Sequence, residues 1–104
     1  MDRQIVQTDH APAPVGPYNQ AIAATGSMLF VSGQIPLDPQ TGALVGGDDI
    51  VAQTEQAIAN LKAILAAGGA TLDNVVKTSV FLKDMNDFAT MNATYAKHFG
   101  EDNA

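Results

Sequence analysis

The sequence predicts an α+β domain in which two helices pack on one face of a β-sheet. Three observations favour this class. Apolar residues between positions 21 and 45 have the spacing of short strands divided by turn residues. Two later stretches repeat apolar residues every three or four positions, as amphipathic helices do, and one strand-like run separates them. The order of hairpin, helix, strand and helix is typical of strands and helices that form two separate layers.

The first strands are expected at residues 21–25 and 28–32. Gly26 and Ser27 lie between them and form a two-residue turn of the kind that joins hairpin strands. The run from residue 28 to residue 31 is apolar without alternation, which indicates a strand covered on both faces. Shorter strands at 34–37 and 43–45 flank a turn at 38–42, where proline fixes φ and glycine accepts a left-handed conformation.

An amphipathic helix is expected to begin at residue 50, with Asp48 or Asp49 as its N-cap. Gly68 and Gly69 end it, because glycine adopts the left-handed cap at little cost. The residues that form its apolar stripe are Ile50, Val51, Ala57, Ile58, Leu61, Ile64 and Leu65.

A strand at residues 75–83 and a second helix at residues 85–99 complete the pattern. Alternation in the strand places Val76, Thr78, Val80 and Leu82 on one side. If this strand pairs in parallel with the first ones, the connection is a right-handed crossover. Asp84 or Asn86 caps the second helix and Gly100 stops it. Its buried stripe consists of Phe88, Met91, Tyr95 and Phe99.

Composition limits the function. The sequence has no cysteine, so disulfides, thiolate metal sites and cysteine nucleophiles are excluded. Acidic residues number 11 and basic residues 5, and the net charge of -6 argues against nucleic-acid binding. No apolar stretch reaches the length of a membrane span, and the first nine residues lack the apolar run of a signal peptide. We therefore expect one domain over residues 1–104, cytoplasmic and without a membrane partner.

Ordinary catalytic signatures are missing. His10 and His98 lie far apart, and structural or solvated roles suit them better than metal ligation, which needs three or four convergent ligands. The carboxylate pairs at 48–49 and 101–102 are interpreted as a helix cap and a solvated tail. Two clusters of small and polar residues remain, at 16–20 and 32–34, and each is either a turn or a place where backbone approaches a ligand.

These clusters and three further segments resemble the Rid family of reactive intermediate deaminases, also called YjgF proteins. The similarity extends in family order from about Asp9 to Asn103. Its segments are Gly16-Pro17-Tyr18, Val31-Ser32-Gly33-Gln34-Ile35-Pro36, Thr41-Gly42, the long motif at 76–88 that begins Val76-Lys77-Thr78, and Met91-Asn92-Ala93-Thr94-Tyr95.

The resemblance implies a chorismate-mutase-like fold, assembled as a homotrimer with clefts at the subunit interfaces. It implies a deaminase that hydrolyses reactive imines and enamines, such as 2-iminobutanoate and 2-iminopropanoate, to 2-keto acids and ammonia. The family needs no metal or organic cofactor. Tyr18, Ser32, Gly33 and Asn92 match positions that line the family's cleft, and they are expected to bind the substrate.

One departure from the family affects the chemistry. The family's substrate-binding arginine and a glutamate that helps to position water belong to a segment after Ala104, and Arg3, the only arginine, does not match by family order. We therefore expect a domain shortened at its C-terminus, with no catalytic residue assigned and with impaired activity. The alternatives are a trimeric, non-catalytic module that binds metabolites or proteins, and a ribonuclease, which the net charge disfavours.

Overall fold

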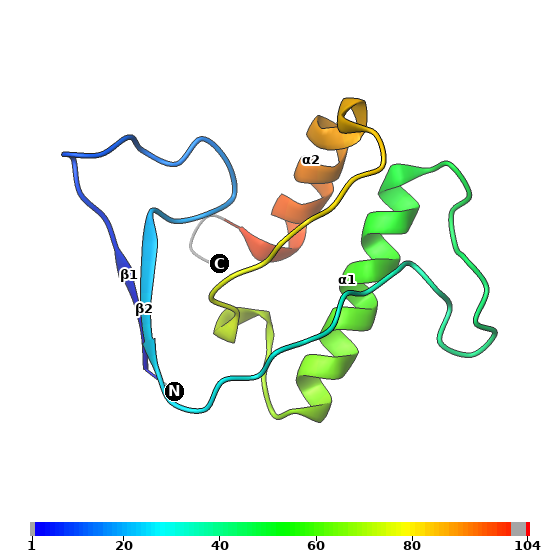
Figure 1. The fold of residues 1–104 in the computed structure, drawn as a ribbon, viewed down its shortest axis with the longest axis horizontal. Coiled ribbons are helices and arrows are strands. Elements are labelled where there is room, and N and C mark those ends of the chain that lie inside the picture. Colours follow the sequence, from blue (N-terminus) through cyan, green and yellow to red (C-terminus); the bar gives the residue numbers. More distant parts are fainter. Residues whose placement is uncertain (1, 101–103) are drawn as a thin grey trace.

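The computed structural model describes residues 2–100 and 104. Its elements are strands β1 (Asp2–Val6) and β2 (Ala21–Thr25), helix α1 (Ile50–Ala67), the short 3-10 helices η1 (Leu72–Asn74) and η2 (Met85–Asp87), and helix α2 (Phe88–Phe99). The two strands lie on one side of the molecule and the two helices on the other, with long extended segments between them (Figure 1). The predicted α+β class is confirmed. Within the described residues, no helix is long and apolar enough to cross a membrane.

The strand at 21–25 is confirmed, but its predicted partner is wrong. β2 pairs antiparallel with β1, and Val6 lies opposite Ala21 in the register. The chain after Gly26 does not turn back; it stays extended and reaches the end of α1. There Leu29 contacts Gly68 so closely that a Cβ on this glycine would lie 2.8 Å from Leu29 Cδ2. Packing against α1 therefore competes with the expected hairpin.

The turn at 38–42 is confirmed. The carboxylate of Asp38 accepts hydrogen bonds from the backbone N–H of Gln40 at 2.8 Å and of Thr41 at 3.3 Å. Gly42 has a φ of 72°, the left-handed conformation that glycine tolerates. The two short strands around this turn amount to a single antiparallel bridge between Leu37 and Leu44.

Both helices begin and end where local chemistry predicts. Asp49 caps α1 by accepting from the N–H of Val51 at 3.0 Å, and Gly69 with a φ of 79° follows its end. Asp84 accepts from the N–H of Asn86 at 2.9 Å and caps η2, which continues into α2. Gly100, with a φ of 69°, ends α2. The buried core residues of the two helices are Ile58, Leu65, Met91, Thr94 and Phe99.

Residues 75–83 are extended but do not form the predicted strand, because the described chain offers no neighbouring strand that pairs with them. The predicted alternation holds only in part. Val76, Thr78 and Leu82 are half-buried and Phe81 is 92% exposed, but Val80, predicted on the same side as Val76, is 48% exposed. The right-handed crossover stays a prediction, since it depends on the missing pairing.

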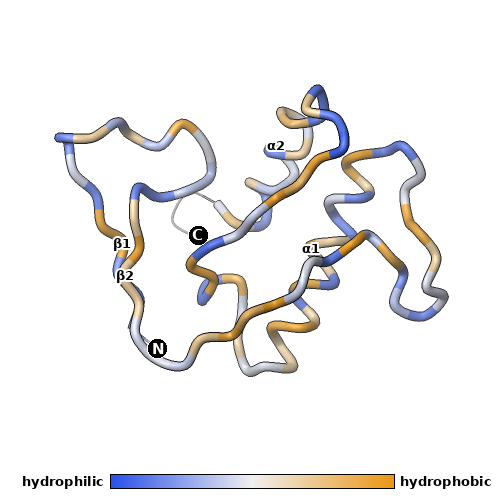
Figure 2. The backbone as a smooth tube through the Cα atoms, in the orientation of Figure 1, coloured by the Kyte–Doolittle hydropathy of each residue, from blue (hydrophilic) through white to orange (hydrophobic). Residues whose placement is uncertain are grey.

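Side-chain hydrogen bonds attach both extended segments to the helical layer. The amide of Asn60 on α1 donates to the carbonyl of Leu37 at 2.9 Å. Thr78 and Tyr95 on α2 share a hydrogen bond of 2.8 Å between their hydroxyls. Apolar residues follow both segments (Figure 2), and Phe30, which is 87% exposed, joins Phe81 as an uncovered aromatic side chain. These surfaces are available to another chain.

Candidate functional site

One wall of the candidate site is the loop between β1 and β2, and Gln20 holds the first part of this loop in shape. Its Nε2 donates to the carbonyls of Pro12 at 2.8 Å and Thr8 at 3.1 Å. Its Oε1 accepts from the N–H of Thr8 at 2.7 Å. The sequence analysis did not assign this role. Prolines in the loop supply carbonyl acceptors but no N–H donors. A nearby side-chain amide, here that of Gln20, was therefore the sequence feature that could have indicated this role.

The next part of the loop fixes Tyr18. The N–H of Tyr18 donates to the carbonyl of Gly16 at 2.8 Å. The tyrosine hydroxyl in turn accepts from the N–H of Val15 at 3.2 Å. The ring thus lies back over its own loop, with 46% of the residue exposed. The phenolic O–H can still donate a hydrogen bond to a ligand.

Asn92 on α2 meets this loop at Gly16. A Cβ on Gly16 would lie 3.2 Å from Cε1 of Tyr18 and 3.8 Å from Nδ2 of Asn92. A side chain here would therefore press against the tyrosine ring, whereas its contact with Asn92 would be an ordinary one. Two of the four predicted substrate-binding residues, Tyr18 and Asn92, are brought together in this way.

The other two predicted residues lie elsewhere. Ser32 and Gly33 belong to the extended segment after β2, where Ser32 is exposed. A Cβ on Gly33 would meet no atom within 4 Å. The carbonyl of Ser32 accepts from the side chain of Gln34 at 3.2 Å. Across residues 2–100, no hydrogen bond joins Ser32 or Gly33 to Tyr18 or Asn92.

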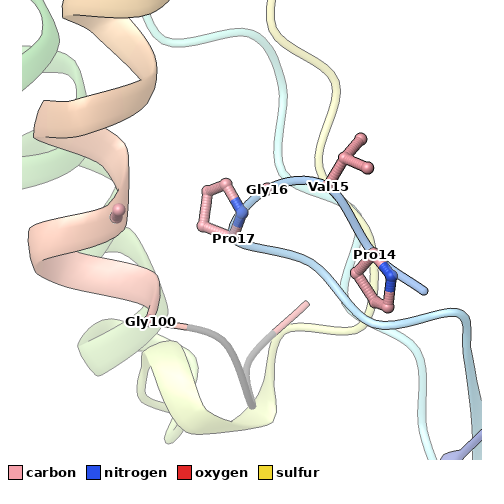
Figure 3. Close-up of a pocket in the computed structure, with 6 residues that line it drawn as sticks. Pro14, Val15, Gly16, Pro17 and Gly100 are labelled. Atoms are coloured by element: carbon pink, nitrogen blue, oxygen red, sulfur yellow. The ribbon is translucent and has the colours of Figure 1, made fainter.

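A cleft of about 490 Å³ lies between the loop and the C-terminal end of α2. The ring of Pro17 projects from the loop toward the helix, and Gly100 lies at the other wall (Figure 3). On α2, Ala96 comes one turn after Asn92, so both residues lie on the same helical face. The residues that line the cleft are Pro14, Val15, Gly16, Pro17, Ala96 and Gly100.

The lining of this cleft is uncharged. Arg3 lies in β1 opposite Ala24 and does not line it. No group of three or more His, Asp or Glu side chains among the described residues could hold a metal ion. A second cleft, of about 320 Å³, shares no residue with the first and is lined by Lys62, Thr71, Leu72 and Asp73.

His98, Asp49 and Tyr95 have structural roles. His98 bonds Glu55 at 2.7 Å between the two helices, as its predicted structural role requires, and Asp49 caps α1. Residues 101 and 102, the second predicted carboxylate pair, lie outside the described residues. Burial raises the pKa of Tyr95 above its usual value of 10.0, and the hydrogen bond to Thr78 partly offsets this effect.

Comparison with known proteins gives consistent matches over nearly the whole chain. Residues 8–104 match the model of a family described as Endoribonuclease L-PSP. A RutC family protein of Pyrococcus horikoshii is 56% identical over 99 residues, which cover 95% of this chain and 77% of that protein. The 2-iminobutanoate/2-iminopropanoate deaminase of Salmonella typhimurium is 52% identical, over 95% of this chain and 75% of its own length.

Solved structures agree with these matches. A crystal structure of Escherichia coli TdcF with bound serine has a TM-score of 0.67 and 42% sequence identity. The match covers 95% of this chain and 76% of that one. About a quarter of the length of each of these relatives thus lies outside the stretch that it shares with this chain.

Proposed function

The chain belongs to the Endoribonuclease L-PSP family, which includes the YjgF/RidA proteins, and we propose that it hydrolyses reactive 2-imino acids to 2-keto acids and ammonia. The deaminase name of the Salmonella relative, at 52% identity, supports this reaction. The observation that carries it is the meeting of Tyr18 and Asn92 at Gly16, beside an uncharged cleft. 2-Iminobutanoate and 2-iminopropanoate are the proposed substrates.

The reaction consumes one water. Water adds to the carbon of the C=N bond, protons move to the nitrogen, and the C–N bond breaks to leave a ketone and ammonia. Asn92 can both donate and accept through its amide, and the Tyr18 hydroxyl can donate. We assign these two groups to substrate binding and orientation, and we assign Ser32 and Gly33 to the same site. Orientation of this kind keeps the water and the imine carbon within reacting distance.

We propose that the site is completed in a homotrimer. In this arrangement Ser32 and Gly33 of one copy face Tyr18 and Asn92 of its neighbour, since no hydrogen bond joins the two pairs within the described part of a single chain. The open space around Gly33 supports this assembly, since backbone without a covering side chain can approach another molecule closely. A cytoplasmic location fits a sequence without cysteine.

The substrate carboxylate needs a cationic partner that the lining of the cleft does not provide. About a quarter of the length of these relatives lies outside the shared stretch, and the family resemblance implies a carboxylate-binding arginine in a segment that follows the positions of this chain. We therefore propose that residues 1–104 form one domain, which corresponds to the shared three quarters of a family member. Residues 1–104 alone are expected to deaminate slowly, because a hydrogen bond to a charged group contributes about 1.5–3 kcal/mol.

The direct test generates 2-iminobutanoate in the cuvette with a pyridoxal-phosphate-dependent dehydratase and measures how fast the keto acid forms. Addition of the protein should accelerate hydrolysis above the rate in buffer. The matched control is the same protein with Asn92→Ala, which should lose most of the acceleration. No acceleration by any concentration of the unsubstituted protein would reject the deaminase proposal.

A second candidate function is binding without turnover. The uncharged lining of the cleft favours it, since such a cleft holds a small ligand but supplies no acid or base. The serine present in the TdcF structure shows that a relative binds an amino acid. Binding of a 2-keto acid without any imine hydrolysis would support this alternative. A ribonuclease is not favoured, because the net charge of -6 repels a phosphate backbone.

A further inference from the structure

We propose that Gln20 is a positioning residue of the imine site. Its side-chain amide substitutes for a peptide group beside β1, and this leaves the backbone of the loop free to carry Tyr18 to Asn92. The inference rests on the proposed deaminase function and adds a residue that acts on turnover through Tyr18, without contact with the substrate.

The first step is the end of the two-stranded ladder. The last pair of β1 and β2 is Val6 with Ala21, and residues 7–20 form the loop between the strands (Figure 1). Beyond this pair, the amide of Gln20 bonds both backbone groups of Thr8. It accepts from the N–H at 2.7 Å and donates to the carbonyl at 3.1 Å. A residue on a neighbouring antiparallel strand makes the same two bonds. Gln20 thus completes the end of β1 with its side chain.

The same amide group also holds the part of the loop that contains the first proline. Nε2 of Gln20 donates to the carbonyls of Pro12 at 2.8 Å and Ala11 at 3.3 Å. The orientation of the amide is fixed, because the N–H of Thr8 can only donate and therefore faces Oε1. A carboxylate of nearly the same shape could still accept from Thr8, but it could not donate to the carbonyls. The arrangement therefore requires an amide.

The backbone that precedes Gln20 makes its hydrogen bonds elsewhere than with β1. The N–H of Asn19 donates to the carbonyl of Ala104 at 3.2 Å, and the N–H of Tyr18 donates to the carbonyl of Gly16 at 2.8 Å. Pro17 is buried, and its ring projects toward α2 (Figure 3). This course of the chain brings Tyr18 to the helix, and Gln20 fixes the loop only two residues away.

The effect of losing this support should be confined to the loop. Residues 8–15 are exposed, whereas the buried apolar side chains of the core belong to the two helices. Without the amide of Gln20, the loop can move while the helices stay packed. A displacement of about 1 Å in a group that orients the substrate can lower the rate up to about 100-fold. We therefore expect slower turnover by a protein that remains folded.

The test uses two substitutions with different chemistry. Gln20→Met keeps the length of the side chain and removes all its hydrogen bonds, whereas Gln20→Glu keeps the acceptor for Thr8 and removes the donor. Both should lower kcat/KM with 2-iminobutanoate about tenfold or more. Gln7→Met, at an exposed glutamine beside Thr8, is the matched control and should leave kcat/KM unchanged. Unchanged turnover by Gln20→Met, in a protein that thermal melts show to be folded, would overturn the proposal.

A double-mutant cycle separates positioning from a merely structural role. Tyr18→Phe already lacks the hydroxyl that Gln20 positions, so adding Gln20→Met to it should lower kcat/KM by less than about a further twofold. Two independent losses would instead multiply. A double variant whose loss equals the product of the two single losses would therefore show that Gln20 does not act through Tyr18.

A measurement without substrate keeps this proposal distinct from the deaminase proposal. The ring of Tyr18 lies against Gly16, so nuclear Overhauser contacts should join its ring protons to the α-protons of Gly16. These contacts should persist in Gln7→Met and disappear in Gln20→Met. If the unsubstituted protein hydrolyses no imine, the deaminase proposal fails, and the contacts still show whether Gln20 positions Tyr18. Their persistence in Gln20→Met would overturn the present proposal.

Discussion

Nε2 of His98 lies 2.7 Å from Oε2 of Glu55, so the last turn of α2 is bonded to α1. Nζ of Lys62 lies 3.1 Å from the other ring nitrogen, Nδ1. A lysine ammonium can only donate, so Nδ1 accepts, and the ring proton resides on Nε2 and is donated to Glu55. The bridge fixes the position of α2, the helix that carries Asn92 and Ala96.

His98→Ala should lower the free energy of unfolding by about 1 kcal/mol, since two partly exposed hydrogen bonds are lost. For a domain of this size, that change lowers Tm by roughly 4–8 °C. Glu55→Gln should have a smaller effect, because the glutamine oxygen still accepts from Nε2. Lys97→Ala, at an exposed position beside His98, is the matched control in thermal melts. Equal melting temperatures for His98→Ala and the control would show that the bridge contributes no stability.

Alkaline conditions should weaken the attachment of residues 75–83 to α2. Burial raises the pKa of Tyr95 in the folded state above the ordinary value of 10.0, so the folded protein holds this proton more tightly than the unfolded chain does. The contribution of protonated Tyr95 to the free energy of unfolding is complete below pH 10 and is lost as the pH rises through the folded-state pKa. Tyr95→Phe keeps the stacking with Phe99 but cannot ionise.

The free energy of unfolding, measured by urea denaturation from pH 8 to pH 11, should therefore fall more steeply for the unsubstituted protein than for Tyr95→Phe. At pH 8 the variant should be less stable by about 0.5–1.5 kcal/mol, because the hydrogen bond to Thr78 is missing. Parallel curves for the two proteins would contradict the assigned role of Tyr95.

Tyr18→Phe and Ser32→Ala should lower imine turnover more than they lower stability. Both residues are exposed, so water can bond the groups that each hydroxyl leaves, and the change in unfolding free energy should stay below about 0.5 kcal/mol. The measurement is kcat/KM with 2-iminobutanoate, beside thermal melts. Ser79→Ala, at another exposed serine of an extended segment, is the control for Ser32→Ala. Lower melting temperatures with unchanged turnover would assign these residues a structural role only.

We expect a homotrimer in solution, because large apolar side chains such as Phe30 and Phe81 remain uncovered in the single chain. Light scattering should give three times the chain mass of 10.8 kDa. Replacement of both phenylalanines by serine should shift the particle toward the mass of one chain. A mass of one chain that does not change with concentration, for the unsubstituted protein, would reject this assembly.

The helices could be predicted from the sequence because their signals are local. Asp49, Asp84, Gly69 and Gly100 act within a few residues of themselves, and the structure places each of them as expected. Strand pairing was not predictable in the same way, because it depends on which distant segment lies alongside. The spacing of residues 21–32 could not reveal that β2 pairs with β1, nor that Leu29 packs at Gly68.

In the candidate site, too, local features could be predicted from the sequence and long-range contacts could not. Turn chemistry indicated Tyr18, but only the family resemblance connected it with Asn92, and the structure brings the two together at Gly16. Ala96, which lines the cleft, gave no signal, since an alanine in a helix is common, and the only signal for Gln20 was its amide beside the prolines of the loop. Their roles depend on the path of the loop, which three-dimensional contacts determine.

The central claim is that this fold deaminates 2-imino acids, and hydrolysis of freshly generated 2-iminobutanoate tests it most directly. The assay compares residues 1–104 with a chimera that carries the last quarter of the Salmonella relative, at equal concentration and beside thermal melts. The chimera should be much more active and should melt at a higher temperature. We expect the added segment to bring a cationic partner for the carboxylate, as the family resemblance implies, and to pair with the open backbone of the extended segments. Loss of the chimera's activity on Asn92→Ala would show that the site described above is used. A chimera without activity, or one that Asn92→Ala leaves unimpaired, would contradict the account.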